Sequence, residues 1–156
     1  MIDGSQFLRG LDLAERRVRD AAEQAMAQAG LDVLHDAIFE EPTVPFEKGT
    51  LRASGSVILA TPEGEELVAT SQGMTDLREG AAPPSPAEPP VGESDPNAII
   101  VLVAFNTPYA ARLHEHPEFH FTEPGAGGKY VEDKLVPKMQ ELMARVAARI
   151  RAALGG

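Results

Sequence analysis

The densest group of residues that could do chemistry lies at positions 114–120, where three histidines and two glutamates fall within seven residues. Neutral imidazole and carboxylate are ligands for zinc and iron. A metal-dependent hydrolase built on this segment would use the cluster His114, Glu115, His116 and His120. The spacing argues against it, because a helical zinc site needs two histidines four residues apart on one face, whereas Glu118 stands four residues after His114 and Pro117 breaks the helix. We therefore expect no metal and no cofactor here.

On the simpler interpretation, His114 and Glu115 pair at the end of a helix, while His116 and His120 lie in a loop. Other catalytic groups are missing. The chain has no cysteine, which excludes a thiolate nucleophile, a disulfide framework and Cys-ligated metals. The serines at 54 and 56 lack the Gly-x-Ser-x-Gly pattern and a nearby base. Residues 125–129 are rich in glycine and precede a helix, but they lack P-loop spacing and are expected to form a flexible joint. No catalytic residue is predicted.

Composition limits the remaining classes of function. The 156 residues suit one domain over 1–156, and a chain of this length buries roughly 68–70% of its unfolded surface. There are 14 Lys and Arg against 24 Asp and Glu, a net charge of −10, so binding to a phosphate backbone is not the expected task. A function in which the chain contacts DNA without attaching to it is still compatible with this charge. Residues 1–30 lack the pattern of a secretory signal, and the longest apolar run, 98–105, is shorter than the roughly 20 residues of a membrane span, so a soluble protein is expected.

Two long helices are predicted at the ends of the chain. Apolar residues recur every three or four positions over 5–39, which indicates one amphipathic helix, continuous or mildly bent at Gly30 and ending before Pro42. A second helix is expected over about 129–154, interrupted near its start by Pro137. It carries six Lys and Arg against three Asp and Glu, which fits either a solvated face or a surface that binds an acidic partner.

The middle of the chain predicts strands. Residues 56–61 and 66–70 are expected to pair as a hairpin, after a short turn over 51–54 that Thr50 caps. Residues 98–105, rich in Ile and Val, predict a central strand buried on both faces.

A short helix is expected from Pro108 to about Glu115, capped by Thr107 and closed by Pro117. Together these elements predict an α+β fold, with long N-terminal and C-terminal helices packed on one face of a small, mainly antiparallel sheet. Few strands leave exposed edges, which favours oligomerisation.

Residues 72–97 form an excursion between strands, with six prolines, five acidic residues and one basic residue. Loops of this length are typically functional, or ordered by a partner. We expect partners to be bound by its charged residues together with three cations of the final helix: Asp76, Arg78, Glu79, Glu88, Glu93, Asp95, Lys138, Arg145 and Arg149.

Three segments, taken in order, resemble a family of small neck proteins of long-tailed bacteriophages, known as minor capsid, head–tail joining or tail-completion proteins. Residues 45–54, PFEKGTLRAS, are similar to the pattern P-x-x-T/K-G-x-L-R-x-S; residues 105–115, FNTPYAARLHE, look like an apolar strand followed by x-T-P-Y-A-x-x-x-H/E-E; and residues 128–135, GKYVEDKL, resemble a final helix that begins K-Y/F-L/V-E. The residues that carry the resemblance as fold landmarks are Gly49, Leu51, Arg52, Ser54, Pro108, Tyr109, Ala110, His114 and Glu115. The long excursion and Pro137 depart from the family pattern.

The resemblance implies a non-enzymatic structural protein of the virion neck, made in the host cytoplasm. It would form a ring, a homo-hexamer in this family, that joins the connector or stopper of the DNA-filled head to the tail terminator or tail tube. DNA would pass through the ring without sequence-specific binding. The alternatives are the metal-dependent hydrolase of residues 114–120 and a cytoplasmic assembly chaperone or adaptor that binds a basic partner through the acidic excursion.

Overall fold

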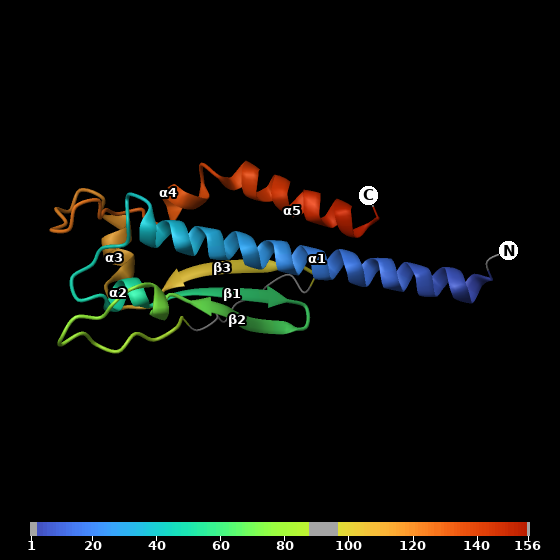
Figure 1. The fold of residues 1–156 in the computed structure, drawn as a ribbon, viewed down its shortest axis with the longest axis horizontal. Coiled ribbons are helices and arrows are strands. Elements are labelled where there is room, and N and C mark those ends of the chain that lie inside the picture. Colours follow the sequence, from blue (N-terminus) through green and yellow to red (C-terminus); the bar gives the residue numbers. More distant parts are fainter. Residues whose placement is uncertain (1–2, 88–96, 156) are drawn as a thin grey trace.

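The N-terminal helix forms the long axis of the molecule, with a small sheet along one side and the C-terminal helix along the other (Figure 1). The computed structural model describes residues 3–87 and 97–155. Its elements are, in order, α1 Gly4–Phe39, α2 Thr50–Ala53, β1 Gly55–Thr61, β2 Gly64–Thr70, a 3₁₀ turn η1 Gln72–Met74, β3 Ile100–Phe105, α3 Ala110–Glu115, α4 Glu132–Leu135 and α5 Met139–Ala153. The predicted α+β class is confirmed.

The predicted continuous helix is confirmed, and α1 runs unbroken through Gly30. A Cβ atom at this position would lie 2.6 Å from a methyl group of Val101 and 2.7 Å from a methyl group of Val57. Glycine therefore stands here because the helix backbone rests directly on β1 and β3. The contact is closed by Leu34 and Ile38, which are buried against Val57.

The sheet has three antiparallel strands in the order β2-β1-β3. The hairpin of β1 and β2 is confirmed, with a register irregularity after Val57. The prediction that residues 98–105 form the central strand is wrong, because β1 takes that place and β3 lies at an edge, half-buried along its length. High apolar content made β3 the obvious candidate for the centre. The position of a strand depends on its pairing partners, and β1 pairs on both sides.

The C-terminal helix packs on α1 rather than directly on the sheet, and Figure 1 shows it on the side of α1 that faces away from the strands. Two ion pairs fix an antiparallel arrangement, Lys138 to Asp36 at 2.7 Å and Arg145 to Asp32 at 2.9 Å. Leu142 and Val146 supply the buried contacts. The expected interruption is found: α4 ends before Pro137, and α5 begins after it.

The starts of the two short helices differ from the predictions: α2 begins at Thr50, one residue earlier than expected, and α3 begins later, at Ala110. Gly49, not Thr50, is the residue before α2, and its φ of 96° is the left-handed region that glycine adopts most readily. The Thr50 hydroxyl instead donates to the Ala82 carbonyl at 2.8 Å. Residues 107–109 form a turn, so α3 begins at Ala110 with no side-chain cap from Thr107. As predicted, α3 ends before Pro117.

Across residues 3–87 and 97–155, no helix combines the length and apolar character that a bilayer span requires. The longest helix, α1, carries charged residues throughout its first half.

The contact at Gly30 predicts opposite effects for one substitution at two glycines of α1. Gly30→Ala should lower the free energy of unfolding, because overpacking costs about 1–3 kcal/mol and helix propensity returns only about 1 kcal/mol. Gly10 has no atom within 4 Å of its virtual Cβ, so Gly10→Ala should leave stability unchanged or raise it by up to about 1 kcal/mol. Urea unfolding of both variants measures the difference. Equal effects at the two positions would contradict close packing at Gly30.

Candidate functional site

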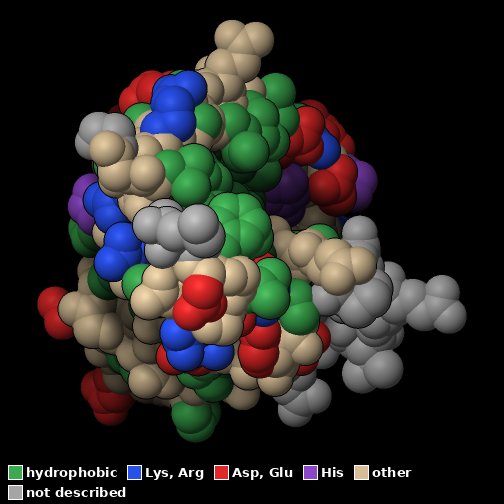
Figure 2. All heavy atoms as spheres, turned by 90° about the vertical axis from the view of Figure 1, so that its right-hand side faces the viewer, with side chains coloured by type: hydrophobic (Ala, Val, Ile, Leu, Met, Phe, Trp, Pro, Cys, Tyr) green, Lys and Arg blue, Asp and Glu red, His purple; other side chains and the backbone are tan. Residues whose placement is uncertain are grey.

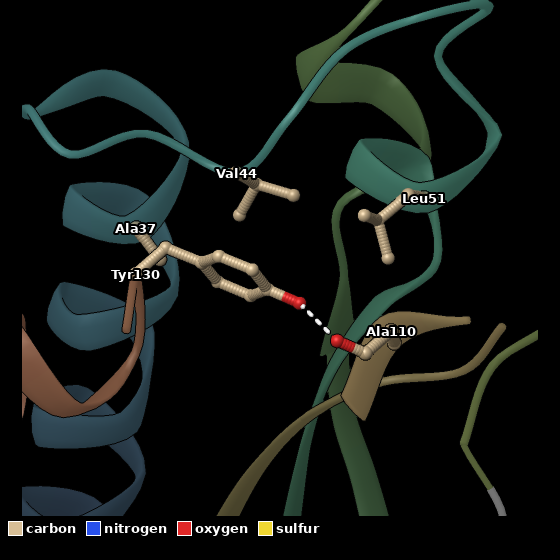
Figure 3. Close-up of a cluster of buried hydrophobic side chains, with 5 residues drawn as sticks. All are labelled: Ala37, Val44, Leu51, Ala110 and Tyr130. Atoms are coloured by element: carbon tan, nitrogen blue, oxygen red, sulfur yellow. Dashed lines mark hydrogen bonds between the residues drawn. The ribbon is translucent and has the colours of Figure 1, made fainter. Parts of the chain in front are cut away.

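The three segments that carry the resemblance meet in one buried cluster at the end of the sheet (Figure 3). Leu51 comes from the first segment, Ala110 from the second and Tyr130 from the third, and all three are less than 10% exposed. Ala37 of α1 and Val44 complete the cluster. The landmark residues Leu51 and Ala110 are therefore core residues, and they bring the first and second segments together in one cluster.

Tyr130 lies at the centre of this cluster with 1% of its surface exposed. Its hydroxyl donates to the Ala110 carbonyl at 3.1 Å, and its ring makes edge contacts with Phe105 and His114 at centroid distances of 5.5 and 5.0 Å. Burial, with a smaller contribution from the charge of Glu115, raises the pKa of the phenol well above its ordinary value. The tyrosine thus acts as a neutral hydrogen-bond donor that ties α3 to the segment before α4.

Arg52 joins the loop after α1 to the loop after α3. Its guanidinium donates to the Val44 carbonyl from Nε at 3.1 Å and from Nη2 at 2.7 Å, and the same Nη2 lies 2.6 Å from an oxygen of Glu123. The side chain is 14% exposed and stacks on Phe46 at 5.0 Å. A mostly buried arginine with these acceptors is a structural clamp.

Two further landmarks act through backbone geometry. The Ser54 hydroxyl donates to the Leu51 carbonyl at 2.7 Å and so closes the end of α2. A Cβ at Gly49 would lie 2.6 Å from the Asp76 carbonyl oxygen, where the chain of residues 72–87 crosses the loop. Any side chain at Gly49 would push these two segments apart.

A groove of about 600 Å³ opens beside the cluster. The landmarks Gly49, Leu51 and Tyr109 line it together with the cations Lys48 and Arg112. Tyr109 is 46% exposed, and the neighbouring Pro108 is also exposed. At this groove the landmark Tyr109 thus reaches the surface.

The histidine segment does not assemble as a metal site of three imidazoles. His114 Nδ1 lies 2.7 Å from Glu115, as predicted, whereas His116 pairs with Glu118 at 2.7 Å and stacks on Phe119. Within the described ranges, the group of His, Asp and Glu side chains close enough to share a metal ion is His114, Glu115 and Glu132.

A cation of the chain already lies at this group. The Lys129 ammonium is 2.7 Å from Glu115 and 3.0 Å from Glu132. The hydrogen bond from Lys129, followed by that of His114, holds the pKa of Glu115 below its usual range, and the two carboxylates raise the pKa of Lys129. The Lys129 ammonium therefore supplies the positive charge that balances these two carboxylates.

The expectation of a flexible joint at residues 125–129 is wrong. Thr43 donates from its backbone to Gly125 at 2.8 Å and accepts from Gly127 at 3.2 Å, which makes a short parallel bridge. A Cβ at Gly128 would lie 2.8 Å from the backbone of Pro117. These glycines allow backbones to pack in contact, so the loop is held on both sides.

The part of the excursion over residues 72–87 follows the domain surface. Arg78 stacks over Phe46 at 4.7 Å and donates to the Glu47 carbonyl at 3.2 Å, so it is engaged within the chain. Asn106 donates to the Pro86 carbonyl at 3.0 Å. The carboxylates of Asp76 and Glu79 are exposed and accessible to a partner. Three of the predicted partner-binding residues lie outside the described residues: Glu88, Glu93 and Asp95.

Among the predicted cations of the final helix, Lys138 and Arg145 are used within the chain, on Asp36, Glu40 and Asp32. Burial acts to raise the pKa of Asp36, but hydrogen bonds from Lys138 and His35 outweigh it and hold this pKa below its ordinary value. The cations of α5 thus compensate for the burial of a carboxylate. Arg149 is exposed.

Sequence reasoning missed the structural role of two residues. Tyr130 was visible only as part of a resembling segment, although it is one of two tyrosines in the chain. Lys134, one of the six cations of the predicted final helix, is 4% exposed and donates to the Glu41 carbonyl at 2.7 Å. Burial lowers its pKa. No local pattern distinguishes a lysine that caps a distant turn from one in solvent.

Comparison of the chain with models of known families, with curated proteins and with solved structures finds no match.

Burial of Tyr130 predicts a stability change at high pH. A phenol whose folded-state pKa lies above the ordinary 10.0 stabilises the fold fully below pH 10 and loses that contribution as the pH rises through the folded value. In a Tyr109→Phe variant, Tyr130 is the one tyrosine left, so phenolate absorbance should appear together with loss of circular dichroism. The Tyr109→Phe/Tyr130→Phe variant is the control and should lose less stability above pH 10. Ionisation near pH 10 with an unchanged circular dichroism spectrum would contradict the burial.

Occupation of the carboxylate group by Lys129 predicts that the protein, purified without a histidine tag, carries no stoichiometric zinc or iron. Elemental analysis after dialysis against zinc measures this. One equivalent of metal that is lost in His114→Ala and kept in His120→Ala would overturn the prediction and restore a metal site at His114, Glu115 and Glu132.

Proposed function

We propose that this chain is a non-enzymatic structural protein of the neck of a long-tailed bacteriophage, one subunit of a ring between the head connector and the tail. The observation that carries the proposal is the packing of the three resembling segments on one another through Leu51, Ala110 and Tyr130. Segments that are far apart in the chain resemble one family in order, and they form a single structural unit here.

The side chains with catalytic potential support the same interpretation. Arg52 holds two loops together, His114 packs on Tyr130, and Lys129 neutralises Glu115. Each of these side chains makes at least one contact within the chain, and among the described residues the buried Nε2 atom of His114 has no hydrogen-bond partner. A protein whose polar clusters serve its own packing is suited to assembly.

The charge distribution is compatible with a DNA channel. The net charge of −10 opposes lasting attachment to phosphates, because affinity for a nucleic acid backbone comes from Lys and Arg. Several cations of the chain are also committed to internal ion pairs, among them Arg52, Lys138 and Arg145. DNA would thus pass the ring without being held by it.

Neighbouring neck proteins would meet the ring at two places. One is the groove beside Tyr109, where Lys48 and Arg112 offer positive charge to an acidic segment. The other is the excursion, whose acidic side chains Asp76 and Glu79 face solvent. By resemblance the ring is a homo-hexamer, located in the virion neck and assembled in the host cytoplasm.

The proposal predicts a discrete ring in solution. Light scattering at several protein and salt concentrations, for the chain alone and with the adjoining neck proteins, should give one closed assembly with six times the mass of the chain. Assembly that needs a neighbouring neck protein would agree equally well. A monomer or dimer that ignores every neck protein would overturn the proposal. Tyr130→Phe serves as a control, since its change is buried and should not alter the assembly.

A further inference from the structure

The three-stranded sheet has two edges, and no other strand within residues 3–87 and 97–155 pairs with them. β1 bonds to a strand on each side, whereas β2 and β3 each have one neighbour. Because the backbone groups of a strand point alternately to its two sides, half of those in β2 and β3 face away from the sheet.

The register shows which groups of β3 face outward. The Asn106 N–H donates to the Ser54 carbonyl at 3.3 Å, so even-numbered residues bond across the pair of β1 and β3. The N–H and C=O groups of Val101, Val103 and Phe105 therefore point to the free edge.

The odd-numbered residues of β1 remain for β2. Leu59 lies opposite Glu66, and two residues further Thr61 lies opposite Gly64. Glu65, between these two residues of β2, therefore turns its N–H to the outer edge.

The two edges differ in charge. Edge strands are normally protected from pairing by charges, prolines or bulges. β3 has none of these, because its sequence IVLVAF is uncharged and its register with β1 is regular. On β2, Glu65 and Glu66 are exposed, and Figure 2, which views the end of the molecule with the β1–β2 turn, shows acidic side chains, interspersed with Lys and Arg, in its lower half. Like charges oppose pairing of β2 with β2, but not of β2 with β3.

A hollow of about 450 Å³ opens beside the outer edge of β3, since β3 lines it and neither β1 nor β2 does. Its apolar lining includes Val103, Phe105, Val131, Leu135 and Val136. Glu115 and Glu132 also line the hollow, so carboxylates lie near the C-terminal half of β3.

These charges favour one direction of pairing. In a parallel pair, Glu65 and Glu66 at the start of β2 lie beside the uncharged start of β3, and residues 67–69 lie beside the apolar hollow. In an antiparallel pair, the two glutamates of β2 would approach Glu115 and Glu132. Repulsion therefore disfavours the antiparallel direction.

We propose that the outer edge of β3 pairs in parallel with the outer edge of β2 from a second copy of this chain. The two edges are different surfaces, so the contact is head-to-tail and each copy binds two others. β2 and β3 both run antiparallel to β1, so rotation about an axis along the strands brings them together in parallel. A closed ring then leaves no edge unpaired. The inference rests on the ring of the proposed function and names its interface.

Cysteine cross-linking tests the contact, because the chain has no cysteine of its own. Leu67 and Leu102 both lie opposite Ile58, on the face of the sheet away from α1. Within one copy they are two strand spacings apart, roughly 10 Å, which is more than the Cα separation of about 7 Å that a disulfide bridges. A disulfide between β2 and β3 must therefore join two copies.

The variants combine Leu67→Cys with Ile100→Cys, Leu102→Cys or Ala104→Cys in turn. Mild oxidation of at least one double variant should give a ladder of covalent oligomers up to the ring. Leu67→Cys alone and Leu102→Cys alone are the controls and should give none. Circular dichroism checks the fold of each variant.

The same method measures the direction of the strands. In the parallel contact, Glu65→Cys should link to the position of β3 two residues before the one that links to Leu67→Cys. Linkage to the position two residues after it would overturn the parallel arrangement.

Proline at the edge of β2 gives an independent measurement. Glu65→Pro removes an outward N–H and keeps the bonds to β1, so the hairpin should fold. Self-association should weaken about tenfold or more, because a carbonyl of β3 loses its donor. Glu65→Ala keeps the N–H and should stay within about threefold of the unsubstituted chain. Light scattering compares the two variants, and equal association would contradict the proposal.

The outcomes separate this interface from the proposed function. A ring that forms while every double variant fails to give a ladder would overturn the interface and leave the proposed function standing. A dimer linked by Leu102→Cys alone would replace it with two-fold pairing of β3 with β3. Absence of any assembly, with or without neck proteins, would overturn the proposed function as well.

Discussion

The approach of α1 to the sheet at Gly30 is the constraint on which the rest of the structure depends. With no side chain at this point, the helix backbone rests on Val57 and Val101. The contact places α1 against both the central strand and an edge strand. Because α1 is straight and 36 residues long, its position on the sheet also sets the places of everything bound along it.

Three consequences follow along the length of α1. On the side away from the sheet, Asp32 and Asp36 receive Arg145 and Lys138, which gives α5 its direction. At its C-terminal end, Ala37 joins the cluster of Tyr130, so the loop segments assemble against a fixed helix (Figure 3). At its N-terminal end, the helix passes the limit of the domain and carries its apolar face into solvent. One element thus connects the core of the domain to an exposed apolar surface.

Polar groups in this protein serve mainly to join segments. Arg52 binds a carbonyl and a carboxylate from different loops, Lys134 binds the Glu41 carbonyl, and Lys129 lies between two carboxylates. Each interaction replaces contacts with water that the groups lose on folding. The cations predicted to bind partners are therefore largely occupied, and the exposed surfaces that remain include Phe7, Leu8 and Leu11 of α1, the carboxylates of Asp76 and Glu79, and the cationic groove beside Tyr109.

The periodic and local features of the chain were predictable. Apolar residues spaced three and four positions apart predicted α1 and the C-terminal helix. Two β-prone runs, one on each side of Pro62, predicted the hairpin. The pairing of His114 with Glu115 followed from their neighbouring positions in the chain. Starts of short helices were less predictable, because Gly49 and the turn at 107–109 depend on contacts with residues 72–87 and with the sheet.

By itself, the amino-acid sequence determined the helices, the hairpin, the fold class, the acidic balance and the absence of thiol chemistry, since these depend on residue types and on spacing within one element. Only the tertiary structure decided which strand is central, that the glycines of 125–128 pack rather than flex, that Lys134 is buried, and which apolar faces stay uncovered. These properties depend on pairs of residues far apart in the chain, such as Thr43 with Gly125 and Lys134 with Glu41. Periodicity reports that a helix has an apolar face, but only packing reports what covers it.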